Sequence, residues 1–288
     1  MPTIRNPIEW GLEQFKSAGA HASAVGHSLG GQKVVESAFE PQVRRIAAAD
    51  LRDVLRKGLE DFAAYRSDVV LICLLYPLVG LVAARLAFGY DLLPLLFPLA
   101  SGLALVGPAT AVGLYEISRR REQGLRVTWA DAFAIVRAPA FGAIAVLGLL
   151  LFAIFFVWLA TAQWIYSATL GPEPPASLSA FLRDLFTTDA GWTMIVVGVG
   201  VGGAFAALVL AVSVVSFPLL LDREVGVRRA VATSLRAVMV NPGPMAAWGA
   251  IVATALIIGS IPLFLGLIVV MPVLGHATWH LYRRVVPR

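Results

Sequence analysis

One run without a charged residue, from Pro242 to Gly275, constrains the fold of this chain more than any other feature. A hydrocarbon core about 30 Å thick is crossed by about 20 apolar residues in a helix, so the run is too long to cross once. Small and helix-breaking residues cluster at Gly259-Ser260-Ile261-Pro262, which favours a turn there. The run therefore predicts two membrane-spanning helices joined by a short turn.

The rest of the chain has the composition of a membrane protein. Hydrophobic residues make up 58% of the 288 residues and charged residues only 14%, and the mean hydropathy is +0.79. Soluble domains carry about 25% charged residues, so this composition excludes a soluble fold for most of the chain. We expect an all-α, polytopic transmembrane helical bundle with six spans. The predicted spans are 69–88, 92–115, 140–166, 192–221, 244–261 and 262–282.

Charge bias in the loops predicts that the N-terminus and the C-terminus are both cytoplasmic. Lys and Arg are retained on the cytoplasmic side of short loops. Arginines gather before the first span, in alternate connections and in the C-terminal tail, whereas the loop after the third span has only Arg183. We therefore interpret the net charge of +5 as topological. The lipid bilayer is the expected partner, and no nucleic acid is expected.

The residues before the first span form two predicted segments. Residues 1–48 are expected to be a partly flexible cytoplasmic segment, and residues 49–288 a membrane domain. From about Ala49 to Tyr65, apolar residues recur at helical spacing, which predicts an amphipathic helix lying on the inner leaflet. We place its polar residues on the other faces of the helix; they are Arg52, Asp53, Arg56, Lys57, Glu60 and Asp61.

An approximate repeat divides the membrane domain into three hairpins, each preceded by a cytoplasmic interfacial helix. The preceding segments are 51–66, 128–139 and 227–242. Each hairpin also has a proline near its inner end, and these are Pro108, Pro218 and Pro272.

The repeat predicts a polar cluster at the cytoplasmic mouth of the bundle. Residues four and eight positions after each proline lie on one helical face. These positions hold Glu116, Asp222, His276 and His280.

His276 and His280 are the candidate metal ligands. Their i, i+4 spacing places two imidazoles on one helical face, where they are able to share a divalent metal or lie near haem. Glu116 or Asp222 would then supply a third ligand. The alternative is that both rings hydrogen-bond neighbouring polar groups at the inner interface, and we expect no cofactor in that case. Cys73 is the only cysteine, so no cysteine-based metal motif exists.

Two further motifs lack the structural setting that their chemistry needs. Gly26-His27-Ser28-Leu29-Gly30 matches a hydrolase nucleophile elbow, but too few residues precede it for the strands of that fold. The glycines of 198–203 resemble a dinucleotide loop but lie inside an uncharged span. We expect Gly198 and Gly202 to let a neighbouring helix approach closely. The chain is not expected to be an enzyme.

Five segments together carry a family resemblance, and the Gly275-His276-Ala277-Thr278-Trp279-His280 stretch is the most specific of their motifs. The segments are Arg5–Trp10, Leu75–Gly80, Ala87–Leu95, Gly113–Arg120 and Leu274–Arg283. From about Leu51 to the C-terminus the chain resembles the bacterial family of predicted integral membrane proteins called domain of unknown function 2189. The resemblance implies a multi-pass protein of the bacterial inner membrane and names no activity.

Three functional hypotheses follow. The leading one is a non-catalytic accessory, scaffold or assembly component of a complex with other inner-membrane proteins. The second is a small-solute or lipid transporter, for which a cavity that reaches the middle of the membrane is required. The third is metal or haem handling through His276 and His280.

Overall fold

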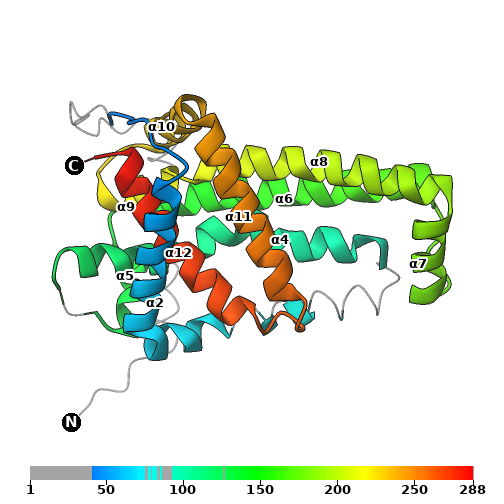
Figure 1. Cartoon of the computed structure of the whole chain (residues 1–288), viewed down its shortest axis with the longest axis horizontal. Coiled ribbons are helices and arrows are strands. Elements are labelled where there is room, and N and C mark those ends of the chain that lie inside the picture. Colours follow the sequence, from blue (N-terminus) through cyan, green and yellow to red (C-terminus); the bar gives the residue numbers. More distant parts are fainter. Residues whose placement is uncertain are drawn as a thin grey trace, which may run out of the picture.

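The computed structural model describes residues 41–74, 77, 78, 80–82, 85, 93–125 and 127–287, and the regular secondary structure among them is helical, with no strand (Figure 1). The predicted all-α class is confirmed. The elements are α2 (Asp50–Cys73), η1 (Leu93–Leu95), α4 (Leu96–Thr110), α5 (Val112–Glu122), η2 (Trp129–Arg137), α6 (Phe141–Thr169), α7 (Leu178–Thr187), α8 (Asp189–Ser213), α9 (Ser216–Asp222), α10 (Val227–Val240), α11 (Pro242–Ser260) and α12 (Leu267–Val285).

Four helical stretches in the described part of the chain are long and apolar enough to cross a membrane. They are Leu93–Glu122, Phe141–Thr169, Asp189–Asp222 and Pro242–Ser260, and each coincides with one of the six predicted spans. Six spans and the arrangement in three hairpins are not confirmed. The predicted span 69–88 lies partly outside the described residues, and α12, in the place of the sixth, is not among the four stretches.

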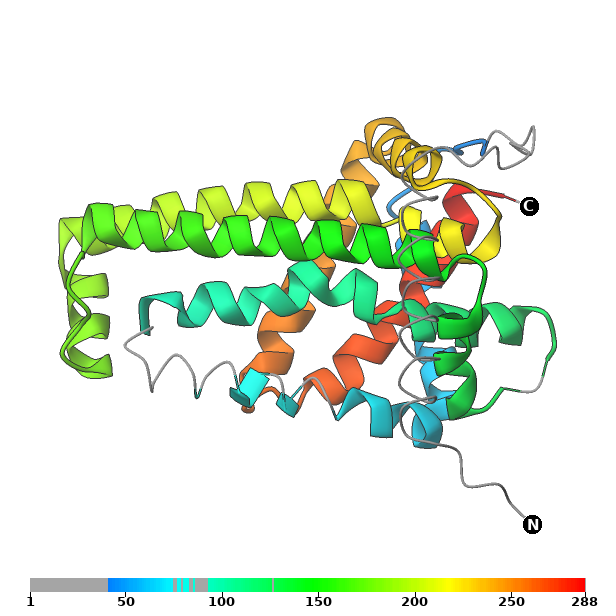
Figure 2. The same ribbon diagram turned by 180° about the vertical axis from the view of Figure 1, so that it is seen from behind.

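The helices α6 and α8 run side by side along the length of the molecule, α4 lies beside them, and α7 crosses their far end (Figures 1 and 2). Trp158 of α6 contacts Phe205 of α8, with ring centroids 5.5 Å apart. A Cβ atom at Gly202 would lie 3.0 Å from the Trp158 ring, so this glycine allows the close approach that was predicted. At Gly198, by contrast, no described atom lies within 4 Å of the Cβ position.

The chain turns between α11 and α12, where the sequence predicts a turn. Leu263 and Phe264 have φ values of 51° and 65°, so the backbone here is left-handed at two residues. The two ends of the turn touch, because a Cβ atom at Gly266 would lie 2.7 Å from Cα of Gly259. Glycine at both positions permits this contact.

The helix α2 covers the residues that were expected to form an interfacial helix, but its apolar face lies against α12 instead of an open leaflet. Leu51 and Val54 are buried, and a Cβ atom at Gly58 would lie 2.7 Å from Cβ of Ala277. Asp61 lies on this same face and is only 4% exposed, so its assignment to a polar face is wrong. The spacing of Leu51, Val54, Gly58 and Asp61 places all four on one side of the helix.

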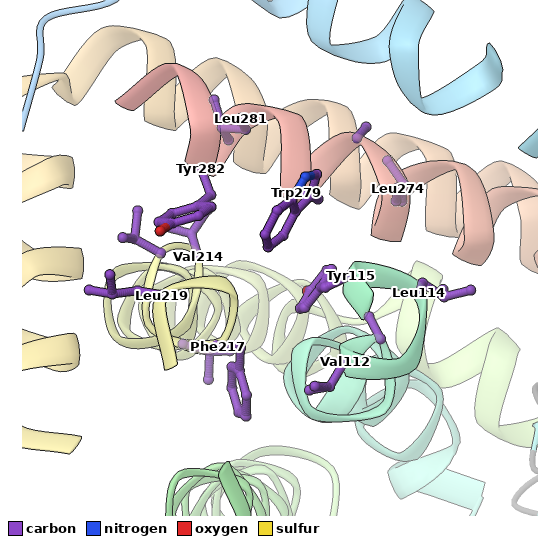
Figure 3. Packing of buried hydrophobic residues seen from close by; sticks show 14 of the residues in the cluster. Val112, Leu114, Tyr115, Val214, Phe217, Leu219, Leu274, Trp279, Leu281 and Tyr282 are labelled. Carbon is purple, nitrogen blue, oxygen red and sulfur yellow. The ribbon is translucent and has the colours of Figure 1, made fainter. Parts of the chain in front are cut away.

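Several of the largest buried side chains lie at one end of the molecule, between α5, α9 and α12 (Figure 3). Trp279 and Tyr282 of α12 contact each other with their rings tilted and the centroids 5.4 Å apart, beside Tyr115 of α5 and Phe217 of α9. This core supports the polar groups described next, because the same three helices carry most of them.

Candidate functional site

A buried carboxylate, Asp61, is the centre of a polar cluster formed by α2, α5 and α12. Its Oδ2 accepts a hydrogen bond from Ser118 Oγ at 2.5 Å and lies 2.9 Å from His280 Nε2. Its Oδ1 accepts one from Arg121 at 2.5 Å. We call Asp61, Ser118, Arg121, His276 and His280 the Asp61 cluster. Three helices distant in sequence are thereby tied to one side chain.

The hydrogen bond of His276 within this cluster fixes its tautomer. His276 Nδ1 lies 2.8 Å from Ser118 Oγ, whose single proton is donated to Asp61. Nδ1 must therefore carry the proton that lies between His276 and Ser118. In the neutral ring Nε2 is then an acceptor, and this atom is buried with no hydrogen-bond partner among the described residues.

The electrostatic environment keeps Asp61 ionised. Burial raises the pKa of the carboxyl group, but the hydrogen bonds from His280 and Ser118 lower it, as does the charge of His280. The result is a pKa below the usual value of 3.8. The cluster is thus a charged, hydrogen-bonded clamp at neutral pH.

Glu116 belongs to a second polar group, which joins α5 to η2. The carboxylate is buried and accepts two hydrogen bonds from Arg119, at 2.7 and 2.9 Å, and one from Arg120 at 2.7 Å. Arg120 also donates to Asp131 at 2.6 Å. Asp131 in turn caps η2 by accepting from the backbone N–H of Thr128. Glu116 therefore sets the position of η2 through Arg120.

Asp222 belongs to a third group, which joins α9 and α12 to the end of α5. Its Oδ2 accepts a hydrogen bond from the Tyr282 hydroxyl at 2.7 Å and lies 3.6 Å from Arg283. Arg283 also donates to Glu122 at 3.1 Å, and the Trp279 indole donates to the same carboxylate at 3.0 Å. These contacts hold the C-terminal half of α12 in place.

The four predicted residues thus lie at one end of the molecule, but the structure distributes them over three groups. His276 and His280 share the Asp61 cluster, whereas Glu116 and Asp222 each have their own partners. The sequence reasoning missed Asp61, Ser118 and Arg121. The helical spacing of Asp61 with Leu51 and Val54 could have placed Asp61 on the apolar face of its helix. No such pattern in the sequence points to Ser118 or Arg121.

The described residues contain no group of three or more His, Cys, Asp or Glu side chains placed to hold a metal ion. His280 Nε2 is engaged by Asp61. Glu116 and Asp222, either of which was expected as a third ligand, bind arginines and Tyr282 in the structure. The nucleophile-elbow motif at 26–30 lies outside the described residues.

One known protein family has a model that matches part of the chain. Residues 96–222 match the model of the family described as "Predicted integral membrane protein (DUF2189)". The match includes α4 to α9 and confirms the resemblance over a shorter range than the sequence predicts, since the stretch from Gly275 to His280 lies beyond it. No curated protein and no solved structure matches the chain.

Proposed function

We propose that this chain, whose residues 96–222 match the model of that family of predicted integral membrane proteins, is a non-catalytic accessory, scaffold or assembly component of a membrane complex. In this proposal the complex lies in the bacterial inner membrane. The arginine-rich end faces the cytoplasm, as the charge bias of the loops favours.

This role is supported by the contacts of the buried polar side chains, which join one helix to another. Glu116, Asp222, His276 and His280 each hold one helix against another, through Arg120, Tyr282, Ser118 and Asp61. Interactions of this kind between buried charged groups fix one arrangement of the helices. A rigid end of defined shape is what a scaffold presents to its partners.

An exposed apolar stripe on α7 offers a surface for such a partner. Leu178, Leu182 and Phe186 follow one another at intervals of four residues and are all exposed. The helix lies outside the four candidate spans, so a membrane crossing does not account for the stripe. An exposed apolar patch of this kind marks an interaction site, and the partner we expect is another protein of the same membrane.

The test is affinity purification of the tagged protein from native membranes in mild detergent, with the co-purifying proteins quantified by mass spectrometry. We expect a membrane protein in stoichiometric amount, and its loss from the variant with Leu182→Ser and Phe186→Ser. Leu149→Ser, at an exposed position of α6, is the control that should retain the partner. Recovery of the protein alone, or with the same partner from all variants, would contradict the proposed interface.

The two other hypotheses have different support. For transport, the described residues line a cavity that is largely apolar, which favours a lipid over a small polar solute. For metal or haem handling, the support is the bare Nε2 of His276. Metal analysis and the haem absorbance of the purified protein, compared with His276→Ala/His280→Ala, decide that case. A stoichiometric signal lost in the variant would establish it.

A further inference from the structure

A cavity lies between α4, α8, α11 and α12, outside the three polar groups. Its volume is about 390 Å³, within the range of roughly 300–1,000 Å³ that is usual for ligand pockets. Alanine, glycine, leucine and valine make up most of the lining. Such a space is suited to an apolar ligand, because water in it would find few hydrogen-bond partners.

The lining changes in character along the length of the cavity. Ala104 and Gly203 lie at one end, near the middle of α4 and α8, while Tyr115, Ser213 and Thr278 lie towards the charged end of the molecule. From Gly203 to Ser213 the helix α8 rises by about 15 Å, at 1.5 Å per residue. A ligand that follows this wall therefore has an apolar end and a hydroxyl-lined end.

The cavity opens sideways between α8 and α11. The residues that line it and are also exposed are small, and they are Gly203, Ala206, Ala207, Ala246, Ala250 and Ala253. Both helices belong to the stretches that are long and apolar enough to cross a membrane. In a bilayer the opening therefore faces lipid chains.

A buried hydroxyl group without a partner in the described part of the chain, that of Ser213, also indicates a ligand in this cavity. Ser213 lines the cavity, is 1% exposed, and its hydroxyl has no hydrogen-bond partner among the described residues. Other hydroxyls nearby bond the carbonyl four residues earlier, as Ser216 does with Val212 and Thr278 with Leu274. An unpaired buried hydroxyl is unfavourable unless something else bonds it. Ser213 is therefore free to bind a ligand.

We propose that this cavity holds one acyl chain of a glycerophospholipid from the surrounding leaflet, with Ser213 Oγ donating a hydrogen bond to an ester carbonyl. The chain enters between α8 and α11 and lies along the apolar wall towards Gly203 and Ala104. The ester then lies at the hydroxyl end, and the headgroup points towards the charged end. This is the direction in which a lipid of that leaflet already lies, so binding requires no reorientation. The inference is independent of the accessory role proposed above.

The experiment uses a glycerophospholipid with a photoreactive diazirine in one acyl chain, placed with the full-length protein in phosphatidylethanolamine and phosphatidylglycerol vesicles. Labelled peptides are located by mass spectrometry. We expect labelling on α8 and α11 within the cavity lining. Gly203→Leu should reduce it several-fold, because a Cβ atom at Gly203 points into open space and a larger side chain fills the cavity. Gly198→Leu, on the same helix with equally open surroundings and outside the lining, should leave it unchanged.

Native mass spectrometry of the purified protein identifies the occupant. We expect one bound phospholipid per chain, bound several-fold less by Ser213→Ala and unchanged in Ser216→Ala, whose hydroxyl is already engaged. Circular dichroism checks that each variant folds, and Ala207→Leu replaces Gly203→Leu if the latter does not. Uniform labelling of α6 and α8, unaffected by the filling variants, overturns the proposal. A free fatty acid, a second copy of the chain or another protein in the cavity also overturns it.

Discussion

The charged end of the molecule and the long helix α8 differ in which side chains they bury. At the charged end, where α9 meets α5 and α12, Glu116, Asp61 and His276 are buried, all at or below 4% exposure. In the stretch Asp189–Asp222, the apolar segment of membrane-spanning length has a mean hydropathy of 2.5, yet only 11% of it is buried inside the molecule. The charged side chains therefore lie inside and many of the apolar ones outside. A bilayer around the long helices accounts for the second region, since it covers the apolar surface that the chain does not cover itself.

The two regions are held together by different interactions. The long helices are held by close contacts, such as that of Gly202 with Trp158, and by few hydrogen bonds. The charged end is held by ion pairs and hydrogen bonds between different helices. Substitutions in the two regions should therefore lower the unfolding free energy by different amounts.

The largest effect is expected at Asp61. Asp61→Ala leaves Arg121 and His280 without their shared carboxylate. Breaking a buried pair costs roughly 3–5 kcal/mol of unfolding free energy, and we expect the lower end because Arg121 is partly exposed. Thermal unfolding in detergent, followed by circular dichroism, measures the loss. Asp53→Asn in the same helix removes ion pairs with Arg56 and Arg284 near the surface and should cost less than about 1 kcal/mol. Equal losses would contradict the comparison.

The next largest effect is expected from a charge placed on the long helices. Val199 is 61% exposed on α8, and an arginine near the middle of a membrane helix costs about 2.5–3.5 kcal/mol on insertion scales. Met239→Arg is the control, since Met239 is 72% exposed on α10, outside the candidate spans. Unfolding in lipid bicelles should separate the two variants by at least about 2 kcal/mol. A cost within about 0.5 kcal/mol for both would place α8 in water.

A smaller effect is expected when acid protonates Asp61. Because its folded-state pKa lies below the unfolded value near 3.8, its contribution to stability is fully present above that pH. That contribution is lost as the pH falls through the lower, folded value. The melting temperature of the wild type should therefore fall more steeply below pH 3.8 than that of Asp61→Asn. Parallel pH profiles would show that Asp61 is not the clamp described here.

The smallest effect is expected within the apolar region. Trp158 donates a hydrogen bond to Ser101 Oγ at 3.0 Å, between α6 and α4. Hydrogen bonds between membrane helices contribute about 0.6 kcal/mol on average. Ser101→Ala should therefore lower the unfolding free energy by about that amount, measured in the same detergent. A loss as large as that of Asp61→Ala would mean that the apolar region is held by polar contacts after all.

The sequence predicted the elements whose signal is local. The spans around α6, α8 and α11 follow from the length of their apolar runs, and the turn before α12 follows from Gly259 and its neighbours. The helix α2 was also predicted, because its apolar residues recur at helical spacing. Its neighbour could not be predicted, since an amphipathic face fits a leaflet and another helix equally well.

The candidate site was predicted only in part, for a related reason. The i, i+4 spacing placed His276 and His280 on one face of α12, and the structure brings both to the same cluster. What they meet there depends on the contact of α12 with α2 and α5, across 158 to 219 residues of sequence. Ser118 and Asp61 become their partners only through that packing. Glu116, expected as a possible third ligand, forms ion pairs with Arg119 and Arg120, which lie one turn away on the same helix.

We propose that α6 and α8 cross the membrane, with α7 and the charged end on opposite sides. In a Cys73→Ser background, single cysteines at Ser179, in α7, and at Glu224, between α9 and α10, report the two ends to a membrane-impermeant maleimide in sealed cells. We expect that Ser179→Cys is labelled directly, whereas Glu224→Cys is labelled only after the membrane is opened. Labelling of both cysteines from the same side of an intact membrane would contradict it.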